Sequence, residues 1–406
     1  MQNKSKKIIL ILFHKYFENK DIDMFDVNEM KKQGFEIEIW GLVKLSYNYN
    51  ISKPLNYYEG KEVTEFRTIG QVNNRISKMN MKTSFFILYP GGAYDDISNF
   101  VRKQIIKYKG NYANYHYPLQ LSSAPDCIKK NKNIFDVFSE YISSWKKNQY
   151  ALYSDIKIFI NTFFYPSTYE FIPGEAGYRL IKNKFIRLSK KCVLLHSFDM
   201  DTYIRNRKRT INNEMVGKKY AVFIDEYMEG HSDFKKEGRK APINVRDRYY
   251  RELNNFFTMI EKIYGCEVVI ALHPKAEYVD NPFCGRKMLI NQTHTLIENA
   301  TLCILHDSTC YPVILFFKKP YFQITTTDLK QDGITNRYIM EYEKQGFSHV
   351  CDISSIDEQR LNGYVNVYNA DVHDIYIDYF MGIKNNSRSL NMSVICQLIK
   401  KELEKK

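Results

Sequence analysis

A histidine, a proline and a lysine stand together directly after an apolar run: His273, Pro274 and Lys275 follow residues 268–272. An imidazole can donate a hydrogen bond at neutral pH, and a lysine supplies a compact positive charge. The proline cannot continue a hydrogen-bonded strand, so it turns the chain and aims its neighbours. The combination suits a phosphate-bearing ligand, although a His-Pro turn that only ends a strand would have the same sequence.

A second cluster repeats this arrangement further along the chain. His306, Ser308 and Thr309 follow the apolar run 302–305 and precede the apolar segment 311–317. We expect Ser308 and Thr309 to open a helix, where free N–H groups, the helix dipole and hydroxyls bind anions. Ordinary helix capping would use the same residues. Since ligands of open parallel sheets bind beyond the carboxyl ends of the strands, both clusters are expected to face one ligand.

A carboxylate near such a ligand could act as a general base. Asp225 and Glu226 end another apolar run, and we take them as the catalytic candidates. Asp95 and Asp96 are rivals because they follow a strand-like run and a Gly-Gly turn, which lets a ligand approach the backbone closely. His14, after the first apolar run, is a further candidate for the base or for a structural role. An acidic loop that only balances nearby lysines and arginines would also fit Asp225 and Glu226.

Short apolar runs alternate with amphipathic stretches along the whole chain. The order strand, helix, strand within the first forty residues predicts a βαβ unit and hence a parallel sheet. In the first half we expect strands within 83–92, 154–164 and 191–198, and helices near 94–108, 132–149 and 201–213. In the second half a strand within 218–227 is followed by the long amphipathic helix 246–265, and the alternation then continues.

The polar stretch 205–219 separates two such series and is the linker candidate. With 406 residues the chain exceeds the usual size of one hydrophobic core, so two domains are expected. We place an N-terminal Rossmann-like domain at residues 1–212 and a C-terminal Rossmann-like domain at 213–406, with the terminal helix 392–406 in the second. The predicted fold class is α/β, with two doubly wound sheets that face a central cleft.

The net charge of +13 favours an anionic partner, although the codon bias of an AT-rich genome would also enrich lysine. The chain carries no helix-turn-helix, zinc-finger or RNA-binding signature, so we do not expect nucleic acid as a partner.

The cysteine pattern and the N-terminal apolar run indicate the cellular compartment. None of the eight cysteines forms a CxxC pair, as expected for reduced thiols in a cytoplasmic protein. The apolar run near the first residues is too short for a signal peptide, and no stretch reaches the roughly 18 apolar residues of a membrane span. We therefore expect a cytoplasmic protein that at most touches a membrane surface.

Two Asp-x-Asp triplets could bind a metal ion. Asp21 and Asp23 look like a helix start, where acids favour the dipole, whereas Asp199 and Asp201 follow a predicted strand. Such triplets are common by chance, and we expect no metal site. The chain also lacks a P-loop and a GxGxxG dinucleotide motif, so no cofactor, kinase or dehydrogenase is expected.

A His-Pro strand end followed by a Ser/Thr pair at a helix start resembles the donor half of bacterial GT-B glycosyltransferases that use CMP-activated acidic sugars. These are the sialyltransferase-like and Kdo-transferase-like families of capsule and lipopolysaccharide synthesis. The resemblance covers roughly residues 218–326. It implies that His273 and Pro274, with Ser308 and Thr309, hold the CMP moiety and its phosphate.

The resemblance also concerns the identity of the general base. In the sialyltransferase-like families an acidic pair is followed by glycine and lies in the first domain. Here Tyr227 follows Asp225 and Glu226 at the start of the second domain, whereas Asp95 and Asp96 lie in the first. The base therefore stays open between these two pairs.

The function implied by this resemblance is transfer of an acidic sugar from a CMP donor to a surface glycan. The sugar would be Kdo or a nonulosonic acid of the sialic, legionaminic or pseudaminic type. His273, Lys275, Ser308 and Thr309, with His306 nearby, would stabilise the departing phosphate in place of a metal ion. A glycan or lipid-linked glycan would be the acceptor, reached by peripheral contact with the anionic inner membrane.

Three other functions stay open. The segment from 303 to 322 also resembles CDP-glycerol or CDP-ribitol phosphotransferases of the teichoic-acid type, which likewise bear a His-Pro. A UDP-sugar 2-epimerase would have the same architecture. A non-catalytic protein that binds a glycan or a nucleotide is the fourth hypothesis.

Overall fold

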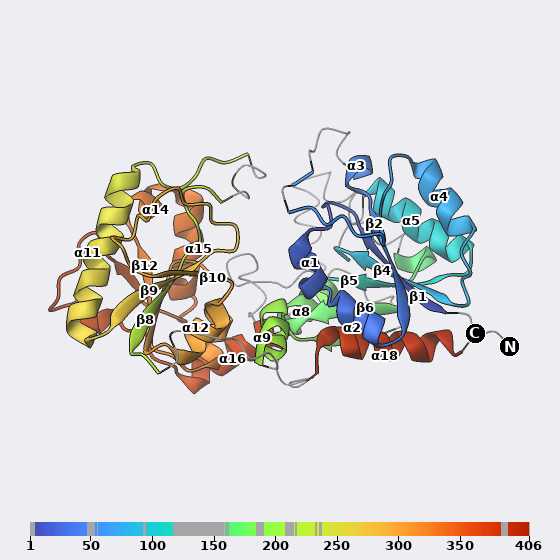
Figure 1. Ribbon diagram of the computed structural model, residues 1–406. Helices are drawn as coiled ribbons and strands as arrows, with labels where there is room; N and C mark the ends of the chain where they lie inside the picture. Colours follow the sequence, from blue (N-terminus) through green and yellow to red (C-terminus); the bar gives the residue numbers. More distant parts are fainter. Residues whose placement is uncertain are drawn as a thin grey trace, which may run out of the picture. The chain divides into compact units, whose positions relative to one another are not determined.

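The computed structural model describes residues 5–46, 53–54, 56–91, 95–116, 158, 162–183, 191–207, 215, 217–231, 234, 238–382 and 389–405. The chain forms two compact units (Figure 1). Unit 1 comprises Met1–Leu119, Asp126–Arg205 and Gly382–Lys406, and unit 2 comprises Gln120–Pro125 and Asn206–Met381. Each unit has its own parallel sheet.

The sheet of unit 1 has seven strands in the order β3-β2-β1-β4-β5-β6-β7. All neighbours pair in parallel. The strands are β1 (Lys6–Leu12), β2 (Phe35–Gly41), β3 (Val63–Glu65), β4 (Ser84–Tyr89), β5 (Asn111–Tyr115), β6 (Tyr169–Pro173) and β7 (Cys192–Leu195). The order reverses direction between β1 and β4, which is the point where ligands of doubly wound sheets bind.

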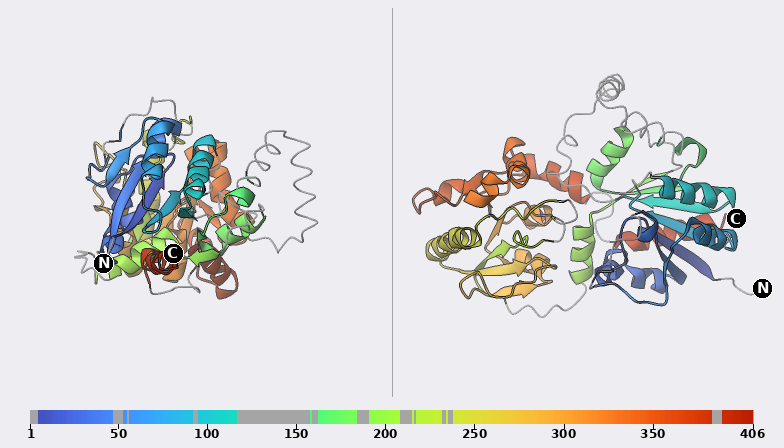
Figure 2. Two further views of the ribbon diagram at one scale, coloured as in Figure 1. Left: turned by 90° about the vertical axis from the view of Figure 1, so that its right-hand side faces the viewer. Right: turned by 90° about the horizontal axis from the view of Figure 1, so that it is seen from above.

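Helices cover both faces of this sheet (Figure 2). The apolar run of β1 explains why: Ile8 and Leu10 pack into one buried cluster, and Ile9 and Ile11 into another on the opposite face. The described helices are α1 (Asn19–Met24), α2 (Val27–Lys32), α3 (Val43–Ser46), α4 (Ile69–Ser77), α5 (Asp96–Lys107), α8 (Gly174–Asn183), α9 (Phe198–Arg207) and α18 (Asn391–Leu403).

The terminal helix α18 belongs to unit 1, whereas we expected it in the second domain. Its apolar side, with Met392, Ile395 and Ile399, packs into the buried cluster that contains strand β1. An amphipathic pattern predicts a helix but does not say which sheet the apolar side will cover.

The sheet of unit 2 has six strands in the order β10-β9-β8-β11-β12-β13, all parallel. The strands are β8 (Tyr220–Ile224), β9 (Glu267–Leu272), β10 (Met288–Ile290), β11 (Leu302–Leu305), β12 (Tyr321–Thr325) and β13 (Val350–Asp352). The helices are α11 (Arg246–Tyr264), α12 (Thr293–Asn299), α13 (Tyr311–Phe316), α14 (Thr327–Gln331), α15 (Gly333–Lys344) and α16 (Ala370–Met381), with a 3-10 turn at Leu361–Tyr364. The reversal of strand order lies between β8 and β11.

The predicted α/β class with two parallel Rossmann-like sheets is confirmed, but individual elements differ. The prediction of a strand within 154–164 is wrong where this stretch is described, because Ile158 and residues 162–164 are helical. The strand that pairs with β5 is β6 instead. The helix expected at 132–149 lies outside the described residues. No helix in the described part of the chain combines the length and the apolar character that a bilayer crossing requires.

Candidate functional site

The carboxylate of Asp225 joins the two loops that follow β8 and β9 in unit 2. It accepts hydrogen bonds from the backbone N–H of Tyr227 at 3.0 Å, the hydroxyl of Tyr278 at 3.0 Å and the backbone N–H of His273 at 3.4 Å. The side chain is buried, with Asp225 only 5% exposed. Burial raises the pKa of Asp225 to about 6, although these three donors oppose the rise. Asp225 therefore positions its neighbours and has little surface to offer a substrate.

The His-Pro-Lys sequence folds back on itself at the end of β9. The backbone N–H of Lys275 donates to Nδ1 of His273 at 3.1 Å, and that of Ala276 donates to the carbonyl of His273 at 2.9 Å. Pro274 has no N–H and fixes the turn that brings Lys275 back. Because Nδ1 accepts a hydrogen bond, neutral His273 carries its proton on Nε2. The turn thus places the Nε2–H of His273 beyond the end of the strand.

A second imidazole faces this donor. Nε2 of His231, from the loop after β8, lies 3.2 Å from Nε2 of His273, and the two ring centroids are 4.5 Å apart. The ring of Phe234 packs edge-on against His231. The two loops held by Asp225 therefore bring two histidines into contact, and both side chains are only partly buried.

The cluster after β11 differs from the expectation. His306 is completely buried: Nδ1 hydrogen-bonds the carbonyl of Ile324 at 2.9 Å, and Nε2 the hydroxyl of Tyr249 at 3.0 Å. Burial lowers the pKa of His306 to about 4, so the ring is neutral. Its expected contact with a substrate is wrong, because both ring nitrogens are occupied inside the unit; His306 fastens β11 to α11 and β12.

Ser308 and Thr309 do not open a long helix. The helix α13 begins at Tyr311 and has six residues. The hydroxyl of the buried Ser308 accepts the N–H of Cys310 at 3.2 Å and supports the turn before the helix. Thr309 is exposed. A helix this short offers little dipole, so anion binding at this turn depends on the side chains and the turn itself.

Two carboxyl groups meet where the strand order reverses. Glu226 follows β8, and Asp307 follows the adjacent β11. Burial holds the pKa of Glu226 well above its usual range, and the charges of Asp307 and Asp225 add to the rise. Oε1 of Glu226 is buried and has no hydrogen-bond partner in the part of the chain that the structure describes. This carboxyl therefore binds a proton more readily than an exposed glutamate does.

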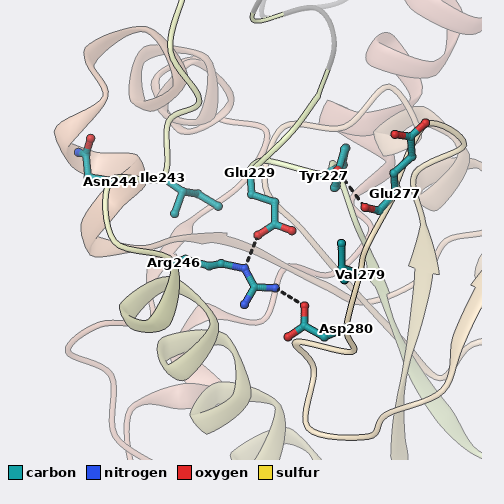
Figure 3. Close-up of a pocket in the computed structure, with 8 residues that line it drawn as sticks. All are labelled: Tyr227, Glu229, Ile243, Asn244, Arg246, Glu277, Val279 and Asp280. Carbon is teal, nitrogen blue, oxygen red and sulfur yellow. Dashed lines mark hydrogen bonds and ion pairs between the residues drawn. The ribbon is translucent and has the colours of Figure 1, made fainter.

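A pocket with a volume of about 570 Å³ lies beside these loops in unit 2 (Figure 3). Its lining residues come from the loop after β8, the start of α11 and the loop after β9: Tyr227, Glu229, Ile243, Asn244, Arg246, Glu277, Val279 and Asp280. Arg246 bridges Glu229 and Asp280, each at 2.8 Å. With three carboxylates and one guanidinium the lining is acidic, which disfavours a phosphate in the pocket itself.

The rival base candidates of unit 1 lie at the reversal of its own sheet. His14 follows β1, and its Nε2 is 3.0 Å from Oδ2 of Asp95, which follows β4. The other oxygen of Asp95 caps α5 by accepting the N–H of Ser98 at 2.8 Å. Burial opposes ionisation, but the hydrogen bonds from His14 and Ser98 lower the pKa of Asp95 to about 2. A carboxylate of such low basicity, whose two oxygens are both engaged, suits structure better than proton abstraction; Asp96 lies in the first turn of α5.

The Asp-x-Asp triplets are built into unit 1. Asp21 is completely buried and bonds Lys15 at 2.5 Å. Asp201 is buried and bonds Nε2 of His196 at 2.6 Å. One acid of each triplet therefore has a structural partner within the fold, which does not favour a shared metal site.

Sequence reasoning missed three members of the unit 2 site: His231, Tyr278 and Asp307. Tyr278 bonds Asp225, and Asp307 faces Glu226. Asp307 stands between His306 and Ser308, so its position after β11 was a signal. Nothing in the sequence around Tyr278 indicates that its hydroxyl turns back to the end of β8.

No protein-family model matches the chain, and no curated protein matches it. Among solved structures, that of the wall teichoic acid polymerase TagF is similar with a TM-score of 0.50 and 10% identity, over 98% of this chain and 90% of the other. The structure of the glycotransferase of kitacinnamycin is similar with a TM-score of 0.47 and 8% identity, over 98% of this chain and 99% of the other. The structure of the UDP-GlcNAc 2-epimerase from Methanocaldococcus jannaschii is similar with a TM-score of 0.45 and 13% identity, over 97% of this chain and 99% of the other.

At such low identities the likeness concerns the fold alone. The similarity to the polymerase extends over nearly the whole chain and includes both parallel sheets. The chain therefore has the two-domain α/β fold of the GT-B type.

Proposed function

We propose that the chain is a glycosyltransferase that moves an acidic sugar, a nonulosonic acid or Kdo, from a CMP donor to a bacterial surface glycan without a metal ion. One observation supports this most. The turns of His273 and Ser308 follow β9 and β11, which flank β8 in one parallel sheet. Since neighbouring strands lie about 4.8 Å apart, the turns are roughly 10 Å apart along one edge. One nucleotide can contact both.

The donor phosphate would be held by side chains of these turns. Departure of CMP leaves negative charge on its phosphate, and preorganised donors stabilise that charge. Nε2–H of His273, the ammonium of Lys275 and the hydroxyls at Ser308 and Thr309 are donors of this kind. Pro274 contributes by fixing the turn.

Glu226 is the proposed general base, and Asp225 the residue that positions the site. A base must accept a proton from the acceptor hydroxyl near neutral pH, which favours a carboxyl whose pKa is raised. The pKa of Glu226 is raised by burial and by Asp307, whereas Asp225 already accepts three hydrogen bonds.

A nucleotide screen tests the proposal. We expect CMP to raise the melting temperature of the protein more than UDP or GDP, and a CMP-activated acidic sugar to be turned over. Turnover of CDP-glycerol or CDP-ribitol instead would establish the polyol phosphotransferase, and stabilisation by UDP alone the epimerase. Binding of CMP without turnover of any donor would indicate a binding protein, and no stabilisation by any nucleotide would end the proposal.

The metal-independent part of the proposal has its own test. Activity should survive EDTA, because protein donors replace the cation. Loss of activity that Mg²⁺ or Mn²⁺ restores would contradict it and direct attention to Asp199.

A further inference from the structure

The contact between His231 and His273 places one proton between two nitrogens. Nδ1 of His273 is occupied by the N–H of Lys275, so the ring proton is on Nε2. This Nε2–H points at Nε2 of His231, 3.2 Å away. When both rings are neutral, Nε2 of His231 must therefore be the acceptor, and its own proton must be on Nδ1.

Such a pair cannot receive an anion unchanged. A phosphate oxygen is only an acceptor, and the lone pair on Nε2 of His231 would repel it. If His231 takes up a proton on Nε2, that nitrogen becomes a donor, and both Nε2–H groups can turn to the phosphate. Protonation of this imidazole is therefore the change that lets both rings donate to the phosphate.

The surroundings of the pair keep the two rings together. Asp225 holds the backbone of His273, and the backbone N–H of His231 donates to the carbonyl of Tyr227 at 2.9 Å. Besides the two histidines, the charged or titratable side chains that the structure describes in these two loops are Asp225, Glu226, Tyr227, Glu229, Arg239 and Lys240 after β8, and Lys275, Glu277, Tyr278, Asp280, Cys284, Arg286 and Lys287 after β9. Arg246 at the start of α11 offsets Glu229 and Asp280.

We infer that His231 and His273 form one anion-binding unit that takes up a proton from solvent when a phosphoryl group binds. The inference rests on the proposed function only in identifying that group as the phosphate of CMP. Binding forms one N–H bond at His231, and the proton returns to solvent when the nucleotide leaves. His231 is thereby added to the site as a residue that contacts the donor phosphate.

Titration calorimetry with CMP tests this directly. Measured at one pH above neutrality in two buffers of different ionisation enthalpy, the wild-type protein should take up close to one proton per CMP bound. In His231→Asn the amide can still donate to phosphate but cannot be protonated, so uptake should vanish while binding persists. His349→Asn is the matched control because His349 is an exposed histidine of the same unit, and it should behave as the wild type.

The pH dependence gives a second readout. The affinity of the wild type for CMP should fall by up to about tenfold per pH unit above the titration range of the pair, as one linked proton requires. The affinity of His231→Asn for CMP should depend less on pH. Cytidine, which lacks the phosphate, should bind with no proton uptake in either protein. Equal uptake in the wild type and in His231→Asn would overturn the inference.

A further experiment distinguishes failure of the proposed function from failure of the paired histidine site. If no nucleotide binds, inorganic phosphate can be titrated while the histidine ring signals are followed by NMR. Protonation of both rings on addition of phosphate would uphold the paired site without CMP, whereas unchanged ring signals would refute it. Ring signals that shift only with Zn²⁺ would mark a metal site and would also refute it.

Discussion

Single residues decide how the unit 2 site is assembled. The carboxylate of Asp225 collects three donors from two loops, and through them it fixes the backbone of His273. The N–H of Lys275 then sets the tautomer of that histidine. The chemistry of the two partly buried imidazoles thus depends on a buried acid that itself has little access to a ligand.

Replacing His273 by alanine removes the proposed donor to the phosphate. We expect kcat/KM for the CMP-sugar to fall by an amount equivalent to about 2–4 kcal/mol of transition-state stabilisation, the usual effect of losing one such donor. Steady-state kinetics of His273→Ala against the wild type measures it. Unchanged kinetics would remove His273 from the site.

The buried acid Asp225 should make stability depend on pH. Its pKa is about 6 in the folded protein against an ordinary value of 3.8 for an aspartate, so the unfolded chain loses this proton first. The free energy of unfolding should therefore fall as the pH rises from about 4 to about 6, by at most roughly 3 kcal/mol. Asp225→Asn should lack this fall, and denaturant unfolding at several pH values compares the two. Parallel curves would contradict the raised pKa.

The residue types around the site were predictable, but their roles were only partly so. The sequence placed His273 and His306 at strand ends in the same way. The structure gives the two histidines different roles, because Tyr249 and Ile324 occupy both ring nitrogens of His306. Such contacts come from residues distant in sequence, and local spacing carries no information about them.

The long amphipathic helix expected at 246–265 agreed with α11, whereas strand β6 was not predicted. Strand β6 contains Glu170, whose carboxylate bonds Asn114 and Ser167 inside unit 1. A buried glutamate interrupts the apolar run that normally reveals a covered strand. The helix α18 was visible in the sequence, but its partner was not.

The attachment of α18 to unit 1 depends on Asn391. Its side chain accepts the N–H of His196 at 3.2 Å and donates to the carbonyl of the same residue at 2.8 Å, and it is only 1% exposed. Asn391→Ala leaves both backbone groups buried without these bonds, so we expect a loss of about 2–4 kcal/mol in the free energy of unfolding. Denaturant unfolding checks this, with Asn362→Ala in unit 2 as a control on the exposed surface. Equal losses in both variants would contradict the assignment.

At the scale of the whole molecule, the net charge of +13 suits a protein that meets anionic partners. The acidic pocket of unit 2 shows that this charge is not uniform. We therefore expect long-range attraction towards an anionic surface or donor, with local groups determining what binds.

Binding to anionic lipid should reveal this long-range attraction. We expect the protein to sediment with phosphatidylglycerol vesicles at low salt, and to be released as the salt concentration rises and the Debye length shrinks below about 10 Å. Neutral phosphatidylcholine vesicles are the control. Equal binding to both lipids would argue against an electrostatic membrane contact.

The return of α18 to unit 1 gives the chain a nested order. Unit 1 supplies both the first and the last described segments, and Lys6 and Glu404 near its two ends form an ion pair at 2.8 Å. The described residues of unit 2 thus form one insertion within unit 1. A linker between the neighbourhoods of Lys6 and Glu404 should leave unit 1 intact when the chain is opened elsewhere, and under the proposed function exchange of the inserted unit should change which nucleotide is bound while the sheet of unit 1 stays the same.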